Sequence, residues 1–147
     1  MRLVTDPSER HTVQAWQAGK AGGRDGEEWS MRAAIIGIGA IARLHARALA
    51  DIPGVSLVSA CCRTDDKGRA FAAEFGCTWH ADARTMIRRE KPDFVTVATP
   101  SGAHLDAALA AIRQGVPVIC EKPLEITLKR IDRMIAAAAK GGVILGA

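Results

Sequence analysis

Short apolar runs alternate with amphipathic segments from residue 31 to the end of the chain. The apolar runs are nearly continuous, which is typical of parallel strands that helices cover on both faces. Gly or Pro closes most of the amphipathic segments, as is typical of helix ends. Strands are predicted at residues 33–36, 55–62, 77–80, 93–98, 116–120 and 143–145. Helices are predicted at 40–50, 65–75, 82–90, 103–114 and 125–140. Right-handed crossovers between such elements predict an α/β protein with a doubly wound parallel sheet in three αβα layers.

A glycine turn connects the first predicted strand to the first predicted helix. Its sequence, GIGAIA at residues 37–42, matches the G-x-G-x-x-A dinucleotide-binding fingerprint of the Rossmann fold. Gly37 allows the sharp turn, Gly39 leaves room for a pyrophosphate, and Ala42 lets the helix pack closely on the strand. The helix start offers free N–H groups and a partial positive charge to phosphates. The residues expected to line the pyrophosphate are Gly37, Gly39, Ala40, Ile41 and Ala42. Alone, the same motif also fits an ordinary strand–helix turn.

Composition narrows the class of protein. The chain has 147 residues, 48% of them hydrophobic and 24% charged, which is typical of one globular domain. Lys and Arg are scattered and Tyr is absent, so the sequence does not favour a nucleic-acid partner. No apolar run approaches the ~20 residues of a membrane span, so no membrane contact is expected. A net charge of +4 suits a phosphate-bearing small ligand.

The four cysteines indicate a reducing compartment. Cys61, Cys62, Cys77 and Cys120 show no C-x-x-C spacing and no histidine at ligand distance, so no metal site is predicted. Most fall in predicted strands, where a free cysteine behaves as a small hydrophobic residue. A cytoplasmic protein is therefore expected. A redox-active Cys61–Cys62 pair is the alternative.

Residues 1–30 differ from the remainder because they are polar and lack a hydrophobic period. They lack the apolar core of a signal peptide, and their acidic residues do not suit a transit peptide. They are predicted to form a disordered or loosely attached extension, with the dinucleotide-binding domain at 31–147. Met31, directly before the first strand, is a candidate functional start.

Two further motifs make a specific family resemblance. Thr99-Pro100-Ser101 with His104 follows the fourth predicted strand, and Cys120-Glu121-Lys122-Pro123 follows the fifth. With the glycine turn, this order resembles the N-terminal cofactor domain of the Gfo/Idh/MocA oxidoreductases, the glucose–fructose oxidoreductase and inositol dehydrogenase group. The resemblance covers residues 31–147. It implies an NAD or NADP cofactor and hydride transfer with a sugar, cyclitol or related hydroxy compound.

The resemblance implies a catalytic role for Lys122, next to the cofactor-binding Glu121 and Pro123. In the family this lysine reaches the nicotinamide and the substrate hydroxyl and helps proton transfer as hydride leaves. Pro123 would direct the lysine into the cleft, and many members have a cis bond there. The position is suitable because open α/β sheets bind ligands outside the carboxyl ends of their strands. The alternative is a surface lysine followed by a helix-opening proline.

The resemblance also implies that Thr99, Pro100 and His104 border the cofactor. Ser101 as the N-cap of the following helix is a compatible interpretation. For His104, contact with a neighbouring loop is the favoured alternative to direct ligand contact. His45 on the first helix fits the family pattern too, and packing or exposure to solvent is expected for it.

The end of the second strand departs from the NAD pattern. Family members often have an acidic residue there that holds the adenosine ribose, whereas this chain has Cys62. Without a carboxylate, Arg63 and Thr64 could bind a 2′-phosphate, which favours NADP over NAD. Asp65 and Asp66 follow closely, so an acidic ribose contact stays open.

Family members continue into a second domain that supplies most substrate contacts. No residue here can be assigned as the Asp or His partner of the lysine, so the substrate domain is expected to be absent. The 147-residue chain is expected to bind cofactor with little turnover, and to act on a sugar or polyol only if a second domain is supplied. An uncovered apolar edge would favour a homo-oligomer. A non-catalytic dinucleotide sensor or regulator and a methyltransferase are the alternatives.

Overall fold

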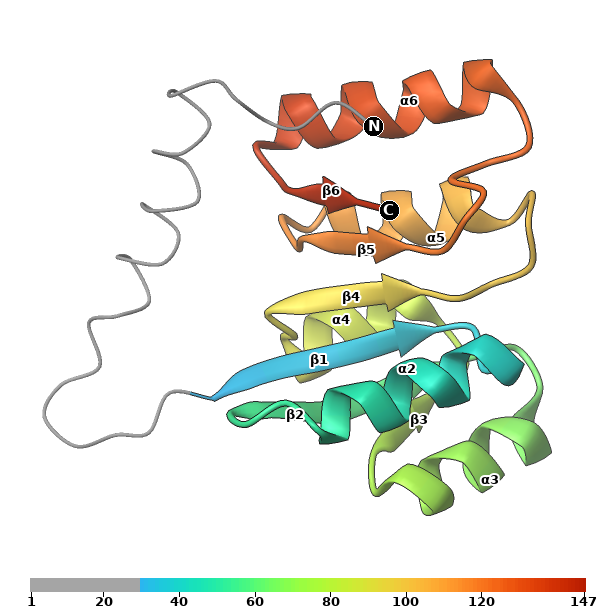
Figure 1. Ribbon diagram of the computed structural model, residues 1–147, viewed down its shortest axis with the longest axis vertical. Helices are drawn as coiled ribbons and strands as arrows, with labels where there is room; N and C mark the ends of the chain where they lie inside the picture. The colour runs from blue at the N-terminus through green and yellow to red at the C-terminus, as the bar shows by residue number, and fades with distance from the viewer. Residues whose placement is uncertain (1–29) are drawn as a thin grey trace, which may run out of the picture. The chain divides into compact units, whose positions relative to one another are not determined.

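A six-stranded parallel sheet is the centre of the computed structural model, which describes residues 30–147 (Figure 1). The strand order is β3-β2-β1-β4-β5-β6, and every neighbouring pair is parallel. The strands are β1 (Met31–Ile36), β2 (Val55–Cys61), β3 (Thr78–His80), β4 (Phe94–Val97), β5 (Val118–Cys120) and β6 (Leu145–Gly146). The helices are α2 (Ala40–Ala50), α3 (Asp65–Phe75), α4 (Ala83–Glu90), α5 (His104–Ile112) and α6 (Leu128–Gly141). The predicted doubly wound Rossmann sheet is confirmed. Apart from Ser30, the extension predicted at residues 1–30 lies outside the described residues.

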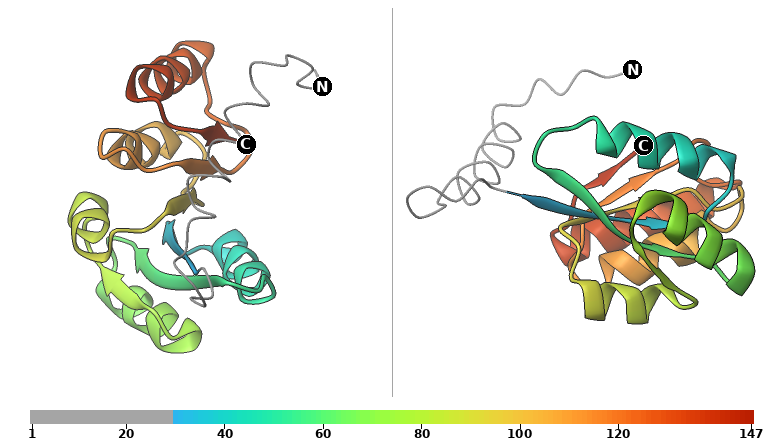
Figure 2. Two further views of the ribbon diagram at one scale, coloured as in Figure 1. Left: turned by 90° about the vertical axis from the view of Figure 1, so that its left-hand side faces the viewer. Right: turned by 90° about the horizontal axis from the view of Figure 1, so that it is seen from below.

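Helices cover the two faces of the sheet in separate groups. Ala33 and Ile35 of β1 pack with α2 and with Phe71 of α3. Ala34 and Ile36 point the other way, into a core with α4, α5 and α6. Figure 2 shows these three helices on one side of the sheet and α2 on the other. Because helices lie over both faces of β1, its sequence is apolar at consecutive positions.

The start of α6 differs from the prediction, with a cause that local sequence does not reveal. The helix begins at Leu128 rather than at residue 125. Thr127 is its N-cap and accepts a hydrogen bond from the Arg130 N–H. Glu125 does not enter the helix because its carboxylate accepts from the N–H of Leu105 in α5 (2.9 Å) and of Ile126 (2.8 Å).

The start of α5 corrects a second prediction. Ser101 is not the N-cap; Ala103 occupies that position and provides no side-chain cap. The residues before the helix form a turn in which the Ala103 N–H donates to the Pro100 carbonyl (3.0 Å). Glu125, 20 residues further along the chain, satisfies the first turn instead, through Leu105.

Two of the four cysteines lie in the core. Cys61 and Cys120 are 5% and 2% exposed. Burial raises the pKa of each thiol to about 12, so both are protonated at neutral pH. A protonated buried thiol is a poor nucleophile, which favours the strand interpretation of Cys61 over redox chemistry.

None of the helices between residues 30 and 147 is long and apolar enough to span a bilayer.

Candidate dinucleotide-binding site

Gly37 brings the glycine turn against the end of β4. Its φ is +93°, in the region that favours glycine. A Cβ on Gly37 would lie 2.6 Å from the carbonyl carbon of Ala98 and from the Thr99 nitrogen. Glycine is therefore required twice, for the turn and for this close approach. The sequence predicted the first reason and missed the second.

Gly39 begins α2 and leaves open space above the helix. It is the N-cap, with φ −70° and no side-chain cap, and apart from its chain neighbours no atom of the described residues lies within 4 Å of a Cβ placed there. The first intrahelical bond of α2 joins the Arg43 N–H to the Gly39 carbonyl. The N–H groups of Ala40, Ile41 and Ala42 therefore precede the ladder and have no partner within the helix.

Ala42 has the packing role that the fingerprint predicts. It is 0% exposed and lies in the core cluster of β1 and α2. Open space at Gly39, N–H groups without intrahelical partners and the positive end of the α2 dipole together suit an anionic pyrophosphate.

The β4–α5 loop lies next to the glycine turn. The Ala98 N–H donates to the Ile36 carbonyl (2.8 Å), which joins the end of β4 to the end of β1. The Thr99 hydroxyl is buried and has no hydrogen-bond partner among residues 30–147, whereas Pro100 is exposed. Buried hydroxyls normally find a partner, so Thr99 Oγ1 is suited to a ligand or a water molecule.

His104 lies behind this loop, at the start of α5. The residue is 1% exposed, and its Nε2 lies 2.8 Å from the Thr99 carbonyl oxygen. Its Nδ1 lies 3.0 Å from the Pro123 carbonyl oxygen. His104 therefore contacts neighbouring loops, as the favoured alternative predicted. A direct contact between His104 and cofactor stays a prediction.

The β5–α6 loop places Lys122 at the same edge of the sheet. The Glu121 N–H donates to the Val97 carbonyl (2.9 Å), so the loop leaves β5 next to the end of β4. The Lys122–Pro123 bond is cis, as the resemblance implied. Lys122 is exposed. These contacts bring Glu121, Lys122 and Pro123 together with the glycine turn and the Thr99 loop.

Glu121 makes a contact that the sequence did not predict. Its Oε1 lies 2.6 Å from Nε2 of His45, a residue expected only to pack or face solvent. Its Oε2 accepts a hydrogen bond from the Lys122 backbone N–H (3.2 Å). The His45 hydrogen bond chiefly holds the pKa of Glu121 below its usual value; the Lys122 N–H adds to this effect and burial opposes it. The two residues are 76 positions apart in the sequence, so local sequence patterns could not predict this contact.

The β2–α3 loop lies at the same edge of the sheet, on the other side of the glycine turn. The Gly37 N–H donates to the Cys61 carbonyl (2.9 Å). Cys62 is half-buried and its Sγ donates to the Thr64 carbonyl (3.1 Å), whereas Arg63 and Thr64 are exposed. Asp65, the acidic alternative, accepts a hydrogen bond from Arg69 Nε (2.7 Å).

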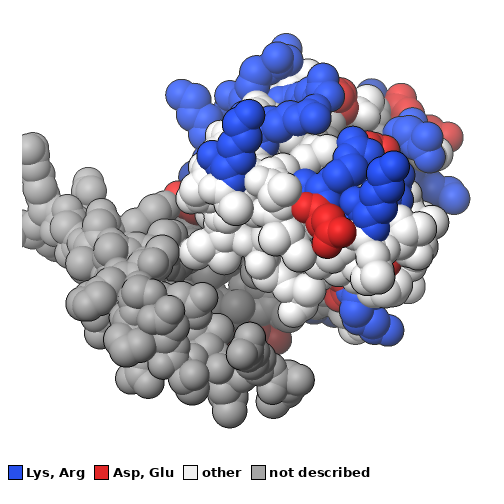
Figure 3. Space-filling view, turned by 90° about the horizontal axis from the view of Figure 1, so that it is seen from above, with Lys and Arg blue, Asp and Glu red and all other residues white. Residues whose placement is uncertain are grey.

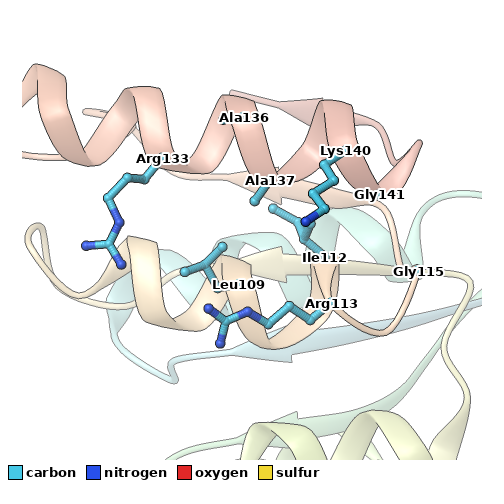
Figure 4. A pocket seen from close by; sticks show the side chains of 9 residues that line it. All are labelled: Leu109, Ile112, Arg113, Gly115, Arg133, Ala136, Ala137, Lys140 and Gly141. Carbon is cyan, nitrogen blue, oxygen red and sulfur yellow. The ribbon is translucent and has the colours of Figure 1, made fainter.

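A groove between α5 and α6 lies away from these loops (Figure 4). It has a volume of about 610 Å³, and Arg113, Arg133 and Lys140 extend around it. Figure 3 shows several basic side chains on the face of the described part that carries α6. Gly115, which lines the groove, precedes β5, whereas Lys122 follows β5. The groove is thus near the amino ends of the strands, opposite the edge where ligands of such sheets bind.

Comparison with known proteins agrees with this geometry. Residues 31–147 match the model of the GFO_IDH_MocA family, described as an oxidoreductase family with an NAD-binding Rossmann fold. The chain belongs to the Gfo/Idh/MocA family. Within this oxidoreductase family, residues 31–147 form the NAD-binding domain, which sets aside the methyltransferase alternative.

Relatives in the Gfo/Idh/MocA family include dehydrogenases named for a sugar and for a cyclitol. D-apiose dehydrogenase of Paraburkholderia graminis is 36% identical over 115 residues, covering 78% of this chain and 31% of the relative. The crystal structure of myo-inositol 2-dehydrogenase from Lactobacillus plantarum matches with a TM-score of 0.73 and 32% identity, covering 80% of this chain and 35% of that one.

A third relative has been solved with ligands. The WlbA dehydrogenase of Bordetella pertussis, in complex with NADH and UDP-GlcNAcA, matches with a TM-score of 0.76 and 28% identity. The match covers 79% of this chain and 36% of that one. This chain therefore spans about a third of the length of each of these three relatives. All three are named as dehydrogenases, which does not favour the sensor alternative.

Proposed function

We propose that residues 31–147 bind a nicotinamide dinucleotide across the carboxyl ends of β2, β1, β4 and β5. The observation that carries this proposal is the open space at Gly39, into which α2 presents N–H groups without intrahelical partners. The pyrophosphate would lie on Ala40, Ile41 and Ala42, where its charge is favoured by the α2 dipole. The unpartnered Thr99 hydroxyl supplies a polar contact beyond it.

The nicotinamide end would lie next to the loop that carries Lys122. When bound, this ring supplies a hydride acceptor or donor. The Lys122 amine would take the proton of the substrate hydroxyl in oxidation, its ammonium form would return that proton in reduction, and Pro123 would fix the backbone that directs the side chain. Pro100 and His104 complete the predicted border on the β4 side.

For the whole protein we propose oxidation or reduction of a sugar, cyclitol or related hydroxy compound. The names of the relatives support this substrate class. Because the chain spans about a third of those proteins, the contacts that select a substrate would come from a second domain. The 147-residue chain is expected to bind cofactor and to turn over little.

The adenosine end would lie at Cys62, Arg63 and Thr64. Arg63 is exposed and takes part in no ion pair within the described part of the chain, so its guanidinium group can meet a 2′-phosphate. Cys62 itself carries no carboxylate that would repel that phosphate. These features support NADP over NAD.

We also propose self-association in a cytoplasmic setting. β6 is an edge strand, and Ile119 and Ile144 near it are each 48% exposed. An edge strand with apolar neighbours tends to pair with another chain. Analytical ultracentrifugation of the purified chain should show a dimer or larger species, and a clean monomer at high concentration would refute this proposal.

The binding proposal can be tested with Gly39→Asp. An aspartate is a good N-cap and φ −70° permits it, so the free energy of unfolding should stay equal or rise. Its carboxylate would occupy the pyrophosphate position and repel the ligand. Titration with NADH and NADPH should therefore show loss of binding of more than about tenfold. The matched control is Thr127→Asp, which places the same charge at the N-cap of α6. Equal affinity for wild type and Gly39→Asp would refute the proposed site.

A further inference from the structure

Two histidines hold the loop that carries Lys122, one from each side. His45 comes from α2, which covers one face of the sheet, and His104 comes from α5, which covers the other. His45 contacts the loop before the cis Lys122–Pro123 bond, and His104 contacts it after that bond.

The His45 side is a continuous path of hydrogen bonds. A carboxylate can only accept, so the His45 Nε2–H donates to Glu121 Oε1 over 2.6 Å. Glu121 Oε2 in turn accepts from the Lys122 backbone N–H over 3.2 Å. The His45 and Glu121 side chains are 21% and 18% exposed, so water competes little for either group. Helix α2 is thereby bonded to the backbone of Lys122.

The His104 side joins the Lys122 loop to the loop that follows β4. The imidazole lies between the Thr99 carbonyl at 2.8 Å and the Pro123 carbonyl at 3.0 Å, and it is 1% exposed. The loop after Pro123 is fixed further by Glu125, whose buried carboxylate binds the Leu105 N–H at the start of α5. His104 and Glu125 therefore leave the far side of the loop little freedom.

We propose that His45 is a positioning residue, which acts through Glu121 to set the direction of Lys122 towards the nicotinamide. The inference rests on the proposed function. Its physical basis is that one helix contacts both ends of the proposed site. The amino end of α2 would hold the pyrophosphate, and His45 in the same helix holds the loop that carries Lys122. The distance between the phosphates and Lys122 is then fixed by α2, and a small misplacement at a reacting centre strongly reduces productive contact.

The test compares NADH with ADP-ribose, which lacks the nicotinamide. In the 147-residue chain, His45→Leu removes the donor, whereas His45→Gln retains an amide donor at a similar reach. His45→Leu should weaken NADH binding about tenfold and change ADP-ribose binding less than about twofold. His45→Gln should restore NADH binding to within about threefold of wild type.

The matched control is His80→Leu. His80 Nε2 lies 2.8 Å from Glu90 Oε1, and these side chains are 10% and 21% exposed, so the variant removes a comparable histidine–carboxylate contact away from Lys122. His80→Leu should leave the ratio of NADH affinity to ADP-ribose affinity unchanged. Glu121→Ala is a second test of the same path. It should give the same ratio of NADH affinity to ADP-ribose affinity as His45→Leu does. The double variant should bind NADH no more weakly than either single variant.

The outcomes separate the two proposals. If wild type binds none of NADH, NADPH and ADP-ribose, the proposed function fails. If wild type binds both and His45→Leu weakens both equally, His45 only supports α2 and the positioning role is refuted. An unchanged ratio in folded Glu121→Ala refutes it as well, even if His45→Leu fails to fold.

Discussion

Gly37 packs so closely on Ala98 that a Cβ at Gly37 would lie 2.6 Å from the Ala98 carbonyl oxygen. This contact joins the turn after β1 to the loop after β4, although about 60 residues separate them in the chain. The pyrophosphate and nicotinamide ends of the proposed site therefore have a fixed relation before any ligand binds. Preorganisation of this kind reduces the cost of binding.

Gly37→Ala should lower the free energy of unfolding by about 2 kcal/mol or more, because it combines a positive φ with a backbone clash. Gly39→Ser is the control, since its site is open, its φ is −70° and serine is a good N-cap. Urea unfolding should place Gly39→Ser within about 0.5 kcal/mol of wild type. Similar stability for Gly37→Ala and Gly39→Ser would show that the packing of Gly37 is described wrongly.

Glu125→Ala should destabilise the fold by about 3 kcal/mol, because it leaves buried donors without a partner. The carboxylate binds the Leu105 and Ile126 N–H groups and pairs with Arg130 at 3.2 Å. Asp65→Ala removes another acidic partner of an arginine, but one whose side chain is 59% exposed. Calorimetric unfolding should give less than about 0.5 kcal/mol for Asp65→Ala. A loss for Glu125→Ala no larger than this would contradict a role for Glu125 in joining α5 and the β5–α6 loop.

The free energy of unfolding should fall as the solution becomes acidic, partly because of Glu121. The pKa of Glu121 in the folded chain is held below its ordinary value of 4.5, chiefly by the His45 hydrogen bond. The unfolded chain therefore binds a proton at higher pH than the folded chain does. The stabilisation is complete above about pH 4.5 and is lost as the pH falls through the folded pKa.

Glu121→Gln should weaken this pH dependence. Urea midpoints measured between pH 6 and pH 3 should fall less steeply for the variant than for wild type. Asp82→Asn is the comparison, because the pKa of Asp82 is also low, in this case through its hydrogen bonds with Thr85 at the start of α4. Identical slopes for wild type and Glu121→Gln would mean that the His45–Glu121 contact is absent in solution.

Arg63 should decide the cofactor preference. If it binds a 2′-phosphate, wild type should bind NADPH more tightly than NADH. Arg63→Ser should weaken NADPH binding about tenfold and change NADH binding little. Arg69→Ser on the exposed face of α3 controls for the loss of a positive charge. Tighter binding of NADH to wild type would refute the NADP preference and leave the dinucleotide site itself in place.

Local sequence patterns predicted the fold and the glycine turn because their causes are local. The apolar run at residues 33–36 is buried by helices on both faces, and Gly37 takes a positive φ because the chain turns sharply there. Helix starts were predicted less well. Glu125 looks like a first-turn helix residue, but its partners on α5 are 20 residues away.

The contacts of the two histidines could not be predicted from spacing. His45 meets Glu121 only because α2 and the end of β5 come to the same edge of the sheet. His104 was expected to contact a loop, but its position between two carbonyls depends on the path of the chain around Pro123. The motif order indicated loops that come to the same edge of the sheet, and the bonds between those loops required the structure.

Backbone amide chemical shifts test most directly whether a nicotinamide dinucleotide binds at the carboxyl ends of the strands. Titration of the ¹⁵N-labelled chain with NADPH or NADH should shift the amides of Gly39–Ala42, Thr99 and Lys122. The amides of Arg113, Arg133 and Lys140 around the α5–α6 groove should stay in place. Shifts confined to that groove, or none at millimolar cofactor, would contradict the account.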